Sequence, residues 1–309
     1  MISREIQTLI PQYSFLEVIH TGISSEIYRV YAPSENEYAL KIFNKKVDLE
    51  RFKSELNNCK LLCKAENPDY IRYISSSEDD GISTVKYIVF ELAEKRSLDN
   101  FISQGIPLGE KIAKFISWKI VEMAGRLHKL CFSHRDLNIH NILLNQNYDL
   151  KLGSFGSAKY FLNQNGKSVL LFGRVGTPYY MPPEMNKKLY DGKKADIFSL
   201  GVLILNLISG KQIFKIHKEI VFKLIKKKEY NKFWYLVENG NLNLKLTPEF
   251  KDLIISMIDY NPNNRPDISD VLNHPYFEDI RSFTSDEYLE NEKNMKSKLK
   301  EIEEKLSLK

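Results

Sequence analysis

The stretch His134-Arg135-Asp136-Leu137-Asn138-Ile139-His140-Asn141 holds one carboxylate and two amides within eight residues. A carboxylate such as that of Asp136 can accept a proton from a hydroxyl group, and an amide oxygen such as that of Asn141 can bind a hard cation. A second short segment, Lys151-Leu152-Gly153-Ser154-Phe155-Gly156, follows soon after it. Together the two segments decide which fold and which chemistry are expected of this chain.

The composition is that of an ordinary globular protein. The chain has 309 residues, of which 43% are hydrophobic, and its formal net charge is +5. This length suits one two-lobed domain or two small domains. The mild positive charge comes without an Arg-Gly or Arg-aromatic tract, so a nucleic-acid partner is not expected.

Cysteine usage and apolar runs indicate the compartment. The three cysteines, Cys59, Cys63 and Cys131, are too few for a disulfide scaffold and suit a reducing environment. Cys59 and Cys63 lie four apart on an expected helix, where two small apolar residues facing a core are favoured over a metal site. No apolar run has signal-peptide length at the start, and the longest, at 200–205, is too short to span a bilayer. These absences favour a soluble intracellular protein in the cytoplasm, with the nucleus left open and no membrane partner.

The hydrophobic pattern predicts a β-rich first part and a helical second part. The expected elements of the first part are strands at 14–20, 26–32, 37–43, 70–75 and 85–92, a helix at 48–64 and a polar loop at 76–81. After Ser97 helices dominate, among them an apolar helix at 196–209 and one that begins with Thr247 as N-cap and Pro248 in its first turn. This order predicts an α+β fold with two lobes and a cleft between them.

The tail from Ser282 is charged. Its apolar residues with 4-3-4 spacing are Met295, Leu299, Ile302 and Leu306. A coiled coil would need about three heptads, so a helix packed on its own domain, or a frayed tail, is favoured.

These segments resemble the eukaryotic protein kinases of the Ser/Thr type. The octet at 134–141 matches the catalytic loop H-R-D-L-x-x-x-N. The other similar segments are 38–41 (the V-A-I-K strand), 87–93 (the strand and hinge), 176–184 (G-T-x-x-Y-x-A-P-E, with Pro182 for alanine), 196–201 (D-I-W-S-L-G) and 259–266 (D-P-x-x-R-P). The resemblance implies an N-terminal extension at 1–12, a kinase-like domain at 13–277 with an N-lobe at about 13–93 and a C-lobe at about 97–277, and a charged helical tail at 278–309.

The resemblance also implies roles for individual residues. Asp136 would be the base that takes the proton of a substrate hydroxyl, and Asn141 would bind a metal ion. Lys41 would hold the α- and β-phosphates of ATP and would pair with Glu55, which is favoured over Glu50. The expected ATP-binding residues are Gly22, Ile27, Ala39, Lys41, Phe90, Glu91, Ala93, Leu143 and Ser154.

Two further contacts are implied in the second lobe. Thr177 would contact Asp136 and orient the acceptor hydroxyl, and Arg265 would pair with Glu184. The Gly-Thr-Pro-Tyr-Tyr form at 176–180 is that of the Ser/Thr class. ATP is the implied cosubstrate and a protein the implied substrate or partner, while the oligomeric state stays open.

Three departures from the family pattern concern phosphate handling. Ser154 stands where the family has the aspartate that binds magnesium, and a neutral hydroxyl is a poor ligand for a hard dication. In the glycine-rich loop, read at 20–27, only Gly22 survives, so side chains hinder the approach of the backbone to phosphates. Asn138 replaces the catalytic-loop lysine. Each loss of a preorganised electrostatic group typically costs about 10²–10³ in rate.

Two functions remain open on these residues. The favoured interpretation is a Ser/Thr kinase-like, ATP-binding protein with impaired transfer of phosphate to Ser/Thr hydroxyls, which leaves the use of Mg²⁺ open. The alternative is an inactive pseudokinase that acts as a scaffold or allosteric module. Ser154 is the feature that separates them.

The residues expected to control activation and substrate choice differ from those of kinases that are activated by loop phosphorylation or that prefer basic substrates. The stretch 169–176 has no Ser or Thr, and Gly173 stands at the usual phosphate-acceptor position, so control by loop phosphorylation through Arg135 is not supported. His140 stands where arginine-directed kinases often have glutamate, which argues against a basic-motif substrate. A basic segment contains Lys215, Lys218, Lys223, Lys226, Lys227, Lys228 and Lys232. It is read either as a solvated face or as a docking site for an acidic partner.

Overall fold

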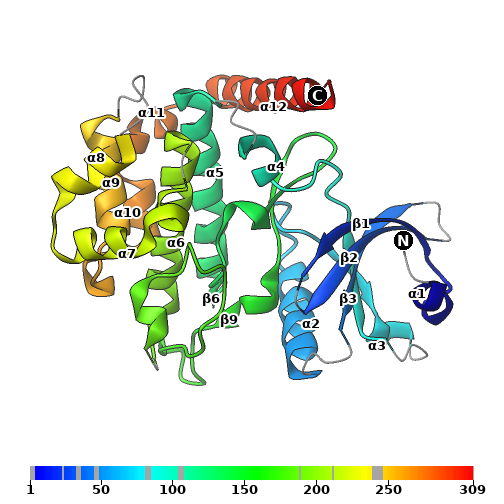
Figure 1. Ribbon diagram of the computed structural model, residues 1–309. Coiled ribbons are helices and arrows are strands. Elements are labelled where there is room, and N and C mark those ends of the chain that lie inside the picture. The colour runs from blue at the N-terminus through cyan, green and yellow to red at the C-terminus, as the bar shows by residue number, and fades with distance from the viewer. Residues whose placement is uncertain are drawn as a thin grey trace. The chain divides into compact units, whose positions relative to one another are not determined.

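The structure is a computed structural model that describes residues 4–22, 24–32, 36–44, 49–80, 85–103, 108–187, 189–210, 212–238 and 246–308. The chain forms two compact units. Unit 1 comprises Met1–Arg96, Leu143–Gln146 and Lys151–Gly156, and unit 2 comprises Ser97–Ile142, Asn147–Leu150 and Ser157–Lys309. Unit 1 is rich in strands and unit 2 in helices, which confirms the predicted fold class (Figure 1).

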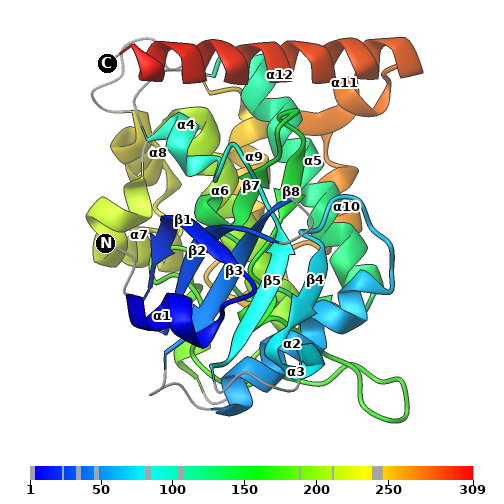
Figure 2. The same cartoon turned by 90° about the vertical axis from the view of Figure 1, so that its right-hand side faces the viewer.

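Unit 1 is built on a five-stranded antiparallel sheet with the order β1-β2-β3-β5-β4 (Figure 2). Its strands are β1 (Ser14–Thr21), β2 (Ser25–Tyr31), β3 (Glu37–Phe43), β4 (Tyr73–Ser76) and β5 (Tyr87–Glu91). Its helices are α1 (Arg4–Leu9), α2 (Leu49–Cys63) and α3 (Ser77–Asp80). The strand predicted at 37–43 has the predicted bounds, and the other strands differ by one to three residues at their ends.

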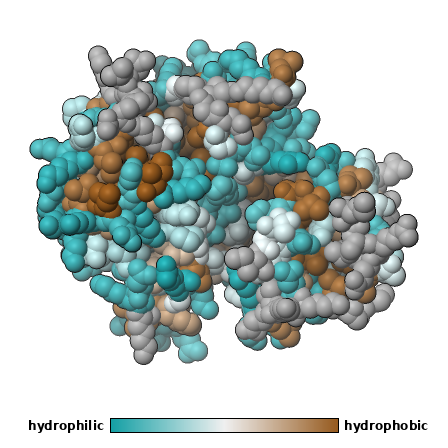
Figure 3. Space-filling model, in the orientation of Figure 1, coloured by the Kyte–Doolittle hydropathy of each residue, from teal (hydrophilic) through white to brown (hydrophobic). Residues whose placement is uncertain are grey.

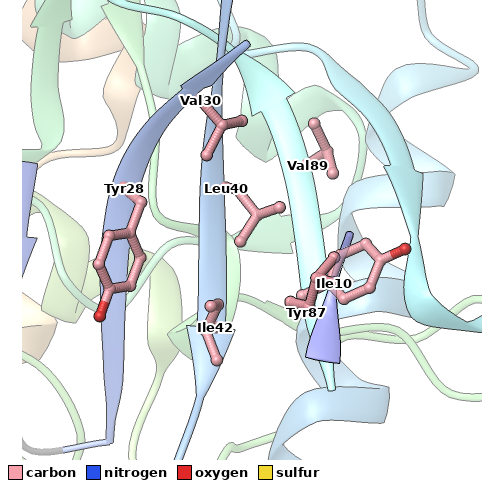
Figure 4. Close-up of a cluster of buried hydrophobic side chains, with 7 residues drawn as sticks. All are labelled: Ile10, Tyr28, Val30, Leu40, Ile42, Tyr87 and Val89. Carbon is pink, nitrogen blue, oxygen red and sulfur yellow. The ribbon is translucent and has the colours of Figure 1, made fainter. Parts of the chain in front are cut away.

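One face of this sheet carries the main core of unit 1. Figure 4 shows that the cluster gathers side chains from β2, β3 and β5, together with Ile10 from the segment before β1. Ile10 is fully buried. Burial of a side chain of this size contributes roughly 2 kcal/mol, so Ile10 of the predicted N-terminal extension at 1–12 packs on the sheet of unit 1.

The opposite face of the sheet is covered in part by α2. Phe52 and Leu56 of α2 pack with Phe43 and Ile88 of the sheet. The predicted helix start at Asp48 lies outside the described residues. Cys59 is buried in the same helix, and this burial raises the pKa of its thiol, so it behaves as a small apolar residue, as expected.

The polar loop predicted at 76–81 is partly helical. Helix α3 follows directly on β4, and Oδ2 of Asp79 accepts hydrogen bonds from the amide and the hydroxyl of Ser76 at 2.7 and 2.8 Å. A short acidic side chain that bonds back to a preceding backbone amide stabilises a first helical turn, which the polarity of the stretch concealed. Gly81 lies outside the described residues.

Unit 2 is mainly helical. Its α-helices are α4 (Asp99–Ile102), α5 (Glu110–Lys129), α6 (Gly192–Ser209), α7 (Ile213–Lys226), α8 (Tyr230–Glu238), α9 (Pro248–Met257), α10 (Ile268–Leu272), α11 (Glu278–Arg281) and α12 (Ser285–Ser307). Its short strands are β6 (Phe132–Ser133) and β9 (Lys159–Tyr160), and its 3-10 helices are η1 (Ile139–Asn141), η3 (Pro183–Asn186), η4 (Pro262–Asn264) and η5 (Pro275–Phe277). The residues of β7 (Ile142–Leu144), β8 (Leu150–Leu152) and η2 (Phe155–Ser157) are divided between the two units.

The apolar helix predicted at 196–209 is the centre of unit 2. Helix α6 lies beside α5 and α9 and is buried on nearly all sides, as its all-round apolar sequence indicates (Figure 1). The side chain of Thr247 caps α9 by accepting a hydrogen bond from the amide of Phe250, which confirms the predicted helix start.

The charged tail forms one long helix on unit 2. Helix α12 packs along the end of α5, as Figure 2 shows, and buries Met295, Leu299 and Ile302. Lys119 of α5 pairs with Glu292 of α12 at 2.7 Å. This confirms the helix packed on its own domain and excludes a frayed tail. In the described part of the chain, no helix combines the length and apolarity needed to cross a membrane.

Candidate active site

The lysine and glutamate predicted to pair do so in unit 1. Nζ of Lys41 on β3 lies 2.5 Å from Oε1 of Glu55 on α2, and their side chains are 14% and 2% exposed. Glu50, the alternative partner, is exposed. This ion pair holds the ammonium group of Lys41 on the side of the sheet toward which the Lys41 side chain points.

Most of the predicted ATP-binding side chains of the sheet share that face. Ile27 lies opposite Lys41 in the β2–β3 pair, and Ala39 lies opposite Phe90 in the β3–β5 pair. Partners across a pair and residues two apart point to the same side of a sheet. All four therefore point away from the core cluster of Figure 4.

The remaining predicted residues of the hinge and its surroundings are also in unit 1. The Glu91 carboxylate pairs with Lys151 at 2.8 Å and accepts a hydrogen bond from the amide of Arg72 at 2.9 Å. The Ala93 carbonyl accepts a hydrogen bond from the amide of Arg96 at 2.9 Å. Leu143 lies so close to Gly153 that a Cβ there would be 2.8 Å from Cδ1 of Leu143. Only glycine therefore fits before Ser154 without a shift of Leu143.

The degenerate glycine-rich loop closes on itself. The amide of Gly22 donates to the carbonyl of Ser25 at 2.9 Å, and the amide of Asn44 donates to the carbonyl of Ser24 at 3.0 Å. Ser25 is buried. The Gly22 amide is therefore used inside the turn, in keeping with the loss of the other glycines. Ile23 lies outside the described residues.

The segment around Ser154 is held against α2 within unit 1. Nδ2 of Asn58 donates to the carbonyl of Phe155 at 3.1 Å, and a Cβ at Gly156 would lie 2.5 Å from Oε2 of Glu55. The sequence did not single out Asn58, although a polar residue on the buried side of a helix signals a bonding partner. Ser154 itself is exposed and has a φ of 65°, a left-handed conformation that aspartate, asparagine and glycine adopt more readily than other residues.

The catalytic-loop aspartate lies in unit 2 and is held by three donors. Oδ1 of Asp136 accepts hydrogen bonds from the amide of Thr177, from Oγ1 of Thr177 and from Nδ2 of Asn138, each at 2.8 Å. Nδ2 of Asn138 also lies 3.0 Å from Oγ1 of Thr177. The residue that replaces the family lysine is thus a neutral donor that orients Asp136, a role that its sequence position did not reveal.

Asn141 and Ser154 are the residues predicted to stand at the metal positions. Nδ2 of Asn141 donates to the carbonyl of Asp136 at 2.8 Å, which leaves its amide oxygen as the end that can bind a cation. Mg²⁺ is usually bound through one or two carboxylates, and neither position has one. These residues therefore do not fit a protein-held Mg²⁺. Among the described residues, no group of three or more His, Cys, Asp or Glu could hold a metal ion.

The buried carboxylate of Asp196 organises the catalytic loop. It accepts hydrogen bonds from the amides of His134 and Arg135 at 2.8 and 2.7 Å and from the hydroxyl of Ser133 at 2.9 Å, and it lies 2.9 Å from Nε2 of His128. Burial opposes its ionisation, but the His128 contact and the backbone donors together lower its pKa. The sequence showed Asp196 only as part of a motif, although a charge in an apolar helix indicates a buried network.

We expect Asp196→Asn to lower the free energy of unfolding by about 2–3 kcal/mol, because the amide cannot satisfy all these donors. The native pKa lies below the ordinary value of 3.8, so the stabilisation is present above that pH and is lost as the pH falls through the native pKa. Urea unfolding should be measured at neutral pH and below about pH 4. The difference in unfolding free energy between wild type and Asp196→Asn should be smaller in acid. Asp252→Asn, at an exposed carboxylate that pairs with His274, is the control, and an equal effect of both substitutions would contradict the prediction.

Arg135 already has partners on the following segment. Its Nε donates to the carbonyl of Ser157 at 2.7 Å, and its Nη1 donates to the carbonyl of Phe172 at 2.9 Å and to the hydroxyl of Tyr190 at 3.2 Å. The Tyr190 hydroxyl in turn donates to the carbonyl of Gly173 at 3.0 Å. Arg135 and Tyr190 therefore hold this segment by hydrogen bonds to its carbonyl groups. Arg135 is the residue that would hold an activating phosphate in a kinase controlled by loop phosphorylation.

The predicted Glu184–Arg265 pair is present and buried in unit 2. The guanidinium lies 2.5 and 2.8 Å from the two carboxylate oxygens of Glu184 and also donates to the carbonyls of Asp259 and Lys194 at 2.8 Å. The side chains of Arg265 and Glu184 are 0% and 3% exposed. This bidentate pair fixes the end of the segment that carries Thr177 to the helical core.

Curated relatives of this chain are protein kinases. The chain is 28% identical over 279 residues to 3-phosphoinositide-dependent protein kinase B of Dictyostelium discoideum, 28% over 283 residues to the phosphorylase b kinase gamma catalytic chain, liver/testis isoform, of Rattus norvegicus, and 30% over 271 residues to serine/threonine-protein kinase chk1 of Schizosaccharomyces pombe. The alignments cover 88%, 86% and 84% of this chain but 29%, 66% and 52% of the relatives. The chain thus spans less than two thirds of each relative.

A family model matches the part of the chain that contains the catalytic loop and both ion pairs. The model described as a protein kinase domain matches residues 13–277. Because this match covers most of the 309 residues, the chain belongs to the protein kinase domain family.

Proposed function

We propose that this protein binds ATP and transfers its γ-phosphoryl group slowly to Ser or Thr hydroxyls of a protein. In this reaction the hydroxyl oxygen attacks the γ-phosphorus, the bond from that phosphorus to the β–γ bridging oxygen breaks, ADP leaves, and Asp136 takes the hydroxyl proton. The observation that carries the proposal is the carboxylate of Asp136, which Thr177 and Asn138 hold by three hydrogen bonds of 2.8 Å. An intracellular, cytoplasmic location is part of the proposal.

The reason to expect slow transfer is the charge that the site lacks. The ion pair of Lys41 with Glu55 supports a role of this lysine in binding phosphates. Ser154 and Asn138 are neutral, and the amide of Gly22 is used within its own turn. Because preorganised charge is usually the largest contribution to such catalysis, each missing group is expected to cost about 10²–10³ in rate.

A pseudokinase is the second candidate, and Ser154 is the observation that favours it. A hydroxyl cannot offset the charge of a divalent cation beside three phosphates. In this case the ordered segments near Arg135 and Glu184 would serve to present a binding surface rather than to catalyse.

Labelled-phosphate transfer decides between the two functions. Wild type and Asp136→Asn would be incubated with labelled ATP and protein or peptide acceptors, in Mg²⁺ and separately in Mn²⁺. Asp136→Asn keeps the size of the side chain but removes the base, so it measures the background. Transfer above that background supports the kinase, and transfer equal to it supports the pseudokinase.

We expect ATP binding to depend little on Mg²⁺, since Lys41 supplies charge to the phosphates and position 154 offers no carboxylate to a metal ion. The dissociation constant of a fluorescent ATP analogue should change by less than about threefold between Mg²⁺ and excess EDTA. Lys41→Met is the control that should weaken binding under both conditions. A loss of affinity greater than about tenfold in EDTA would show that the protein binds the complex of the nucleotide with Mg²⁺, which would contradict this expectation.

A further inference from the structure

Two cations lie close together beside the segment that carries Thr177. Arg174 is an exposed residue of this segment, and Lys218 projects from α7 and donates a hydrogen bond from Nζ to the carbonyl of Pro178. Partial burial of the Lys218 ammonium group, together with the positive charge of Arg174, lowers the pKa of Lys218. The fold thus holds Lys218 where the like charge of Arg174 acts on it.

These cations lack the partners that comparable lysines in unit 2 have. Lys114, Lys194 and Lys251 form ion pairs with Asp279, Asp267 and Glu238 at 2.7, 2.7 and 2.6 Å. Over the described residues, neither Arg174 nor Lys218 forms an ion pair with a carboxylate of this chain. A site that concentrates uncompensated positive charge is complementary to an anion from outside the chain.

An apolar pocket adjoins Arg174. This open pocket of about 570 Å³ is lined by Phe172, Arg174, Met185, Lys187 and Leu189, and no carboxylate is among its described lining residues. Phe172 and Leu189 are 69% and 50% exposed, which is unusual for large apolar side chains. Figure 3 shows more apolar side chains in the region of α7 and α8, and Ile216 and Ile220 of α7 are among the exposed ones.

A smaller hollow lies beside the catalytic loop of unit 2. Its lining includes His140, Thr177, Tyr179 and Lys215, and no carboxylate is among its described lining residues. Thr177 bonds directly to Asp136. Arg174 and Thr177 are on the same segment, so a chain bound at Arg174 lies on the segment that contacts the residue proposed as the base.

We propose that the surface formed by Arg174, Lys218 and the pocket of Phe172 and Leu189 binds an acidic segment of a protein that also carries an apolar side chain. Carboxylates of the segment contact Arg174 and Lys218, and the apolar side chain enters the pocket. A nucleic-acid backbone would match the charge but has no group for the apolar pocket. That the bound segment is also the phosphate acceptor rests on the proposed function, whereas the binding itself does not.

Fluorescence anisotropy without ATP tests the binding separately from transfer. The probes are a labelled serine peptide rich in glutamate and leucine, the same peptide with lysine in place of glutamate, the same peptide with serine in place of leucine, and a short single-stranded oligonucleotide. Arg174→Glu and Lys218→Glu reverse the charges that are proposed to contact the peptide. Lys300→Glu is the control. It changes the net charge by the same amount, but at an exposed position of α12 that is outside the proposed binding surface.

The acidic leucine peptide should bind about tenfold more tightly than the lysine peptide, and each reversal at Arg174 or Lys218 should weaken it about fivefold to tenfold, with further weakening as salt rises. The leucine-to-serine peptide should also bind more weakly. Equal binding of both charged peptides, an equal effect of Lys300→Glu, or tighter binding of the oligonucleotide would overturn the inference. If the acidic leucine peptide binds preferentially but receives no phosphate, the inference about binding is supported and the proposed catalysis is not.

Discussion

Ser154→Asp is expected to raise the rate of phosphate transfer at least about tenfold above wild type, with an upper range of about 10²–10³ if the missing charge were the only defect. The carboxylate would supply the anionic oxygen that a hard divalent cation requires. The gain should fall short of the upper range, because Asn138 and the closed turn at Gly22 also lack features of the family.

The backbone at position 154 favours this substitution. Its φ of 65° is left-handed, where aspartate is tolerated better than serine, and the side chain is exposed. The neighbouring contacts of Asn58 with Phe155 and of Glu55 with Gly156 do not involve the side chain of Ser154. The variant should therefore keep the stability of the wild type.

Ser154→Asn is the matched control, since asparagine has the shape of aspartate and suits the same backbone but carries no charge. Initial rates would be compared at saturating ATP and Mg²⁺, with Asp136→Asn as the background. If the aspartate and asparagine variants are folded, bind ATP and transfer phosphate equally, the impairment does not lie in the charge at position 154, and the pseudokinase gains support.

Arg265→Ala should lower the free energy of unfolding by about 3–5 kcal/mol, because it leaves a buried charge without its partner. The substitution leaves the Glu184 carboxylate buried without its bidentate partner and removes the donors to the carbonyls of Asp259 and Lys194. It also removes the guanidinium that lies 4.9 Å from the centre of the Phe198 ring. Urea unfolding of the variant and the wild type measures the effect.

Two further variants show whether the loss comes from the buried pair. Arg281→Ala removes an exposed guanidinium that donates to two carbonyls, and it should cost less than about 1 kcal/mol. In the double variant Arg265→Ala/Glu184→Gln the loss should be smaller than the sum of the single losses, because the uncompensated charge is gone. A loss below about 1 kcal/mol for Arg265→Ala would mean that the pair contributes little to stability.

Much of the fold and the outline of the site follow from local sequence. The strand at 37–43, the apolar helix around Asp196 and the cap at Thr247 are encoded by residues within a few positions of one another, as periodicity and N-capping are local effects. Glu55 was favoured over Glu50 because it fits the core spacing of Phe52 and Leu56 in the predicted helix. The order of the kinase-like segments indicated that Arg265 pairs with Glu184, because each segment has a characteristic place in the family.

The tertiary structure decided the contacts of buried polar and terminal residues. The donors to Asp196 lie 61 to 68 residues away, and the carbonyl bound by Asn58 lies 97 residues away, so no local pattern contains them. The same holds for the orientation of Asn138 toward Thr177 and for the burial of Ile10. Periodicity states that a side chain is buried or polar, whereas its partner is set by packing between distant segments, where a buried polar group must find a hydrogen bond wherever the fold provides one.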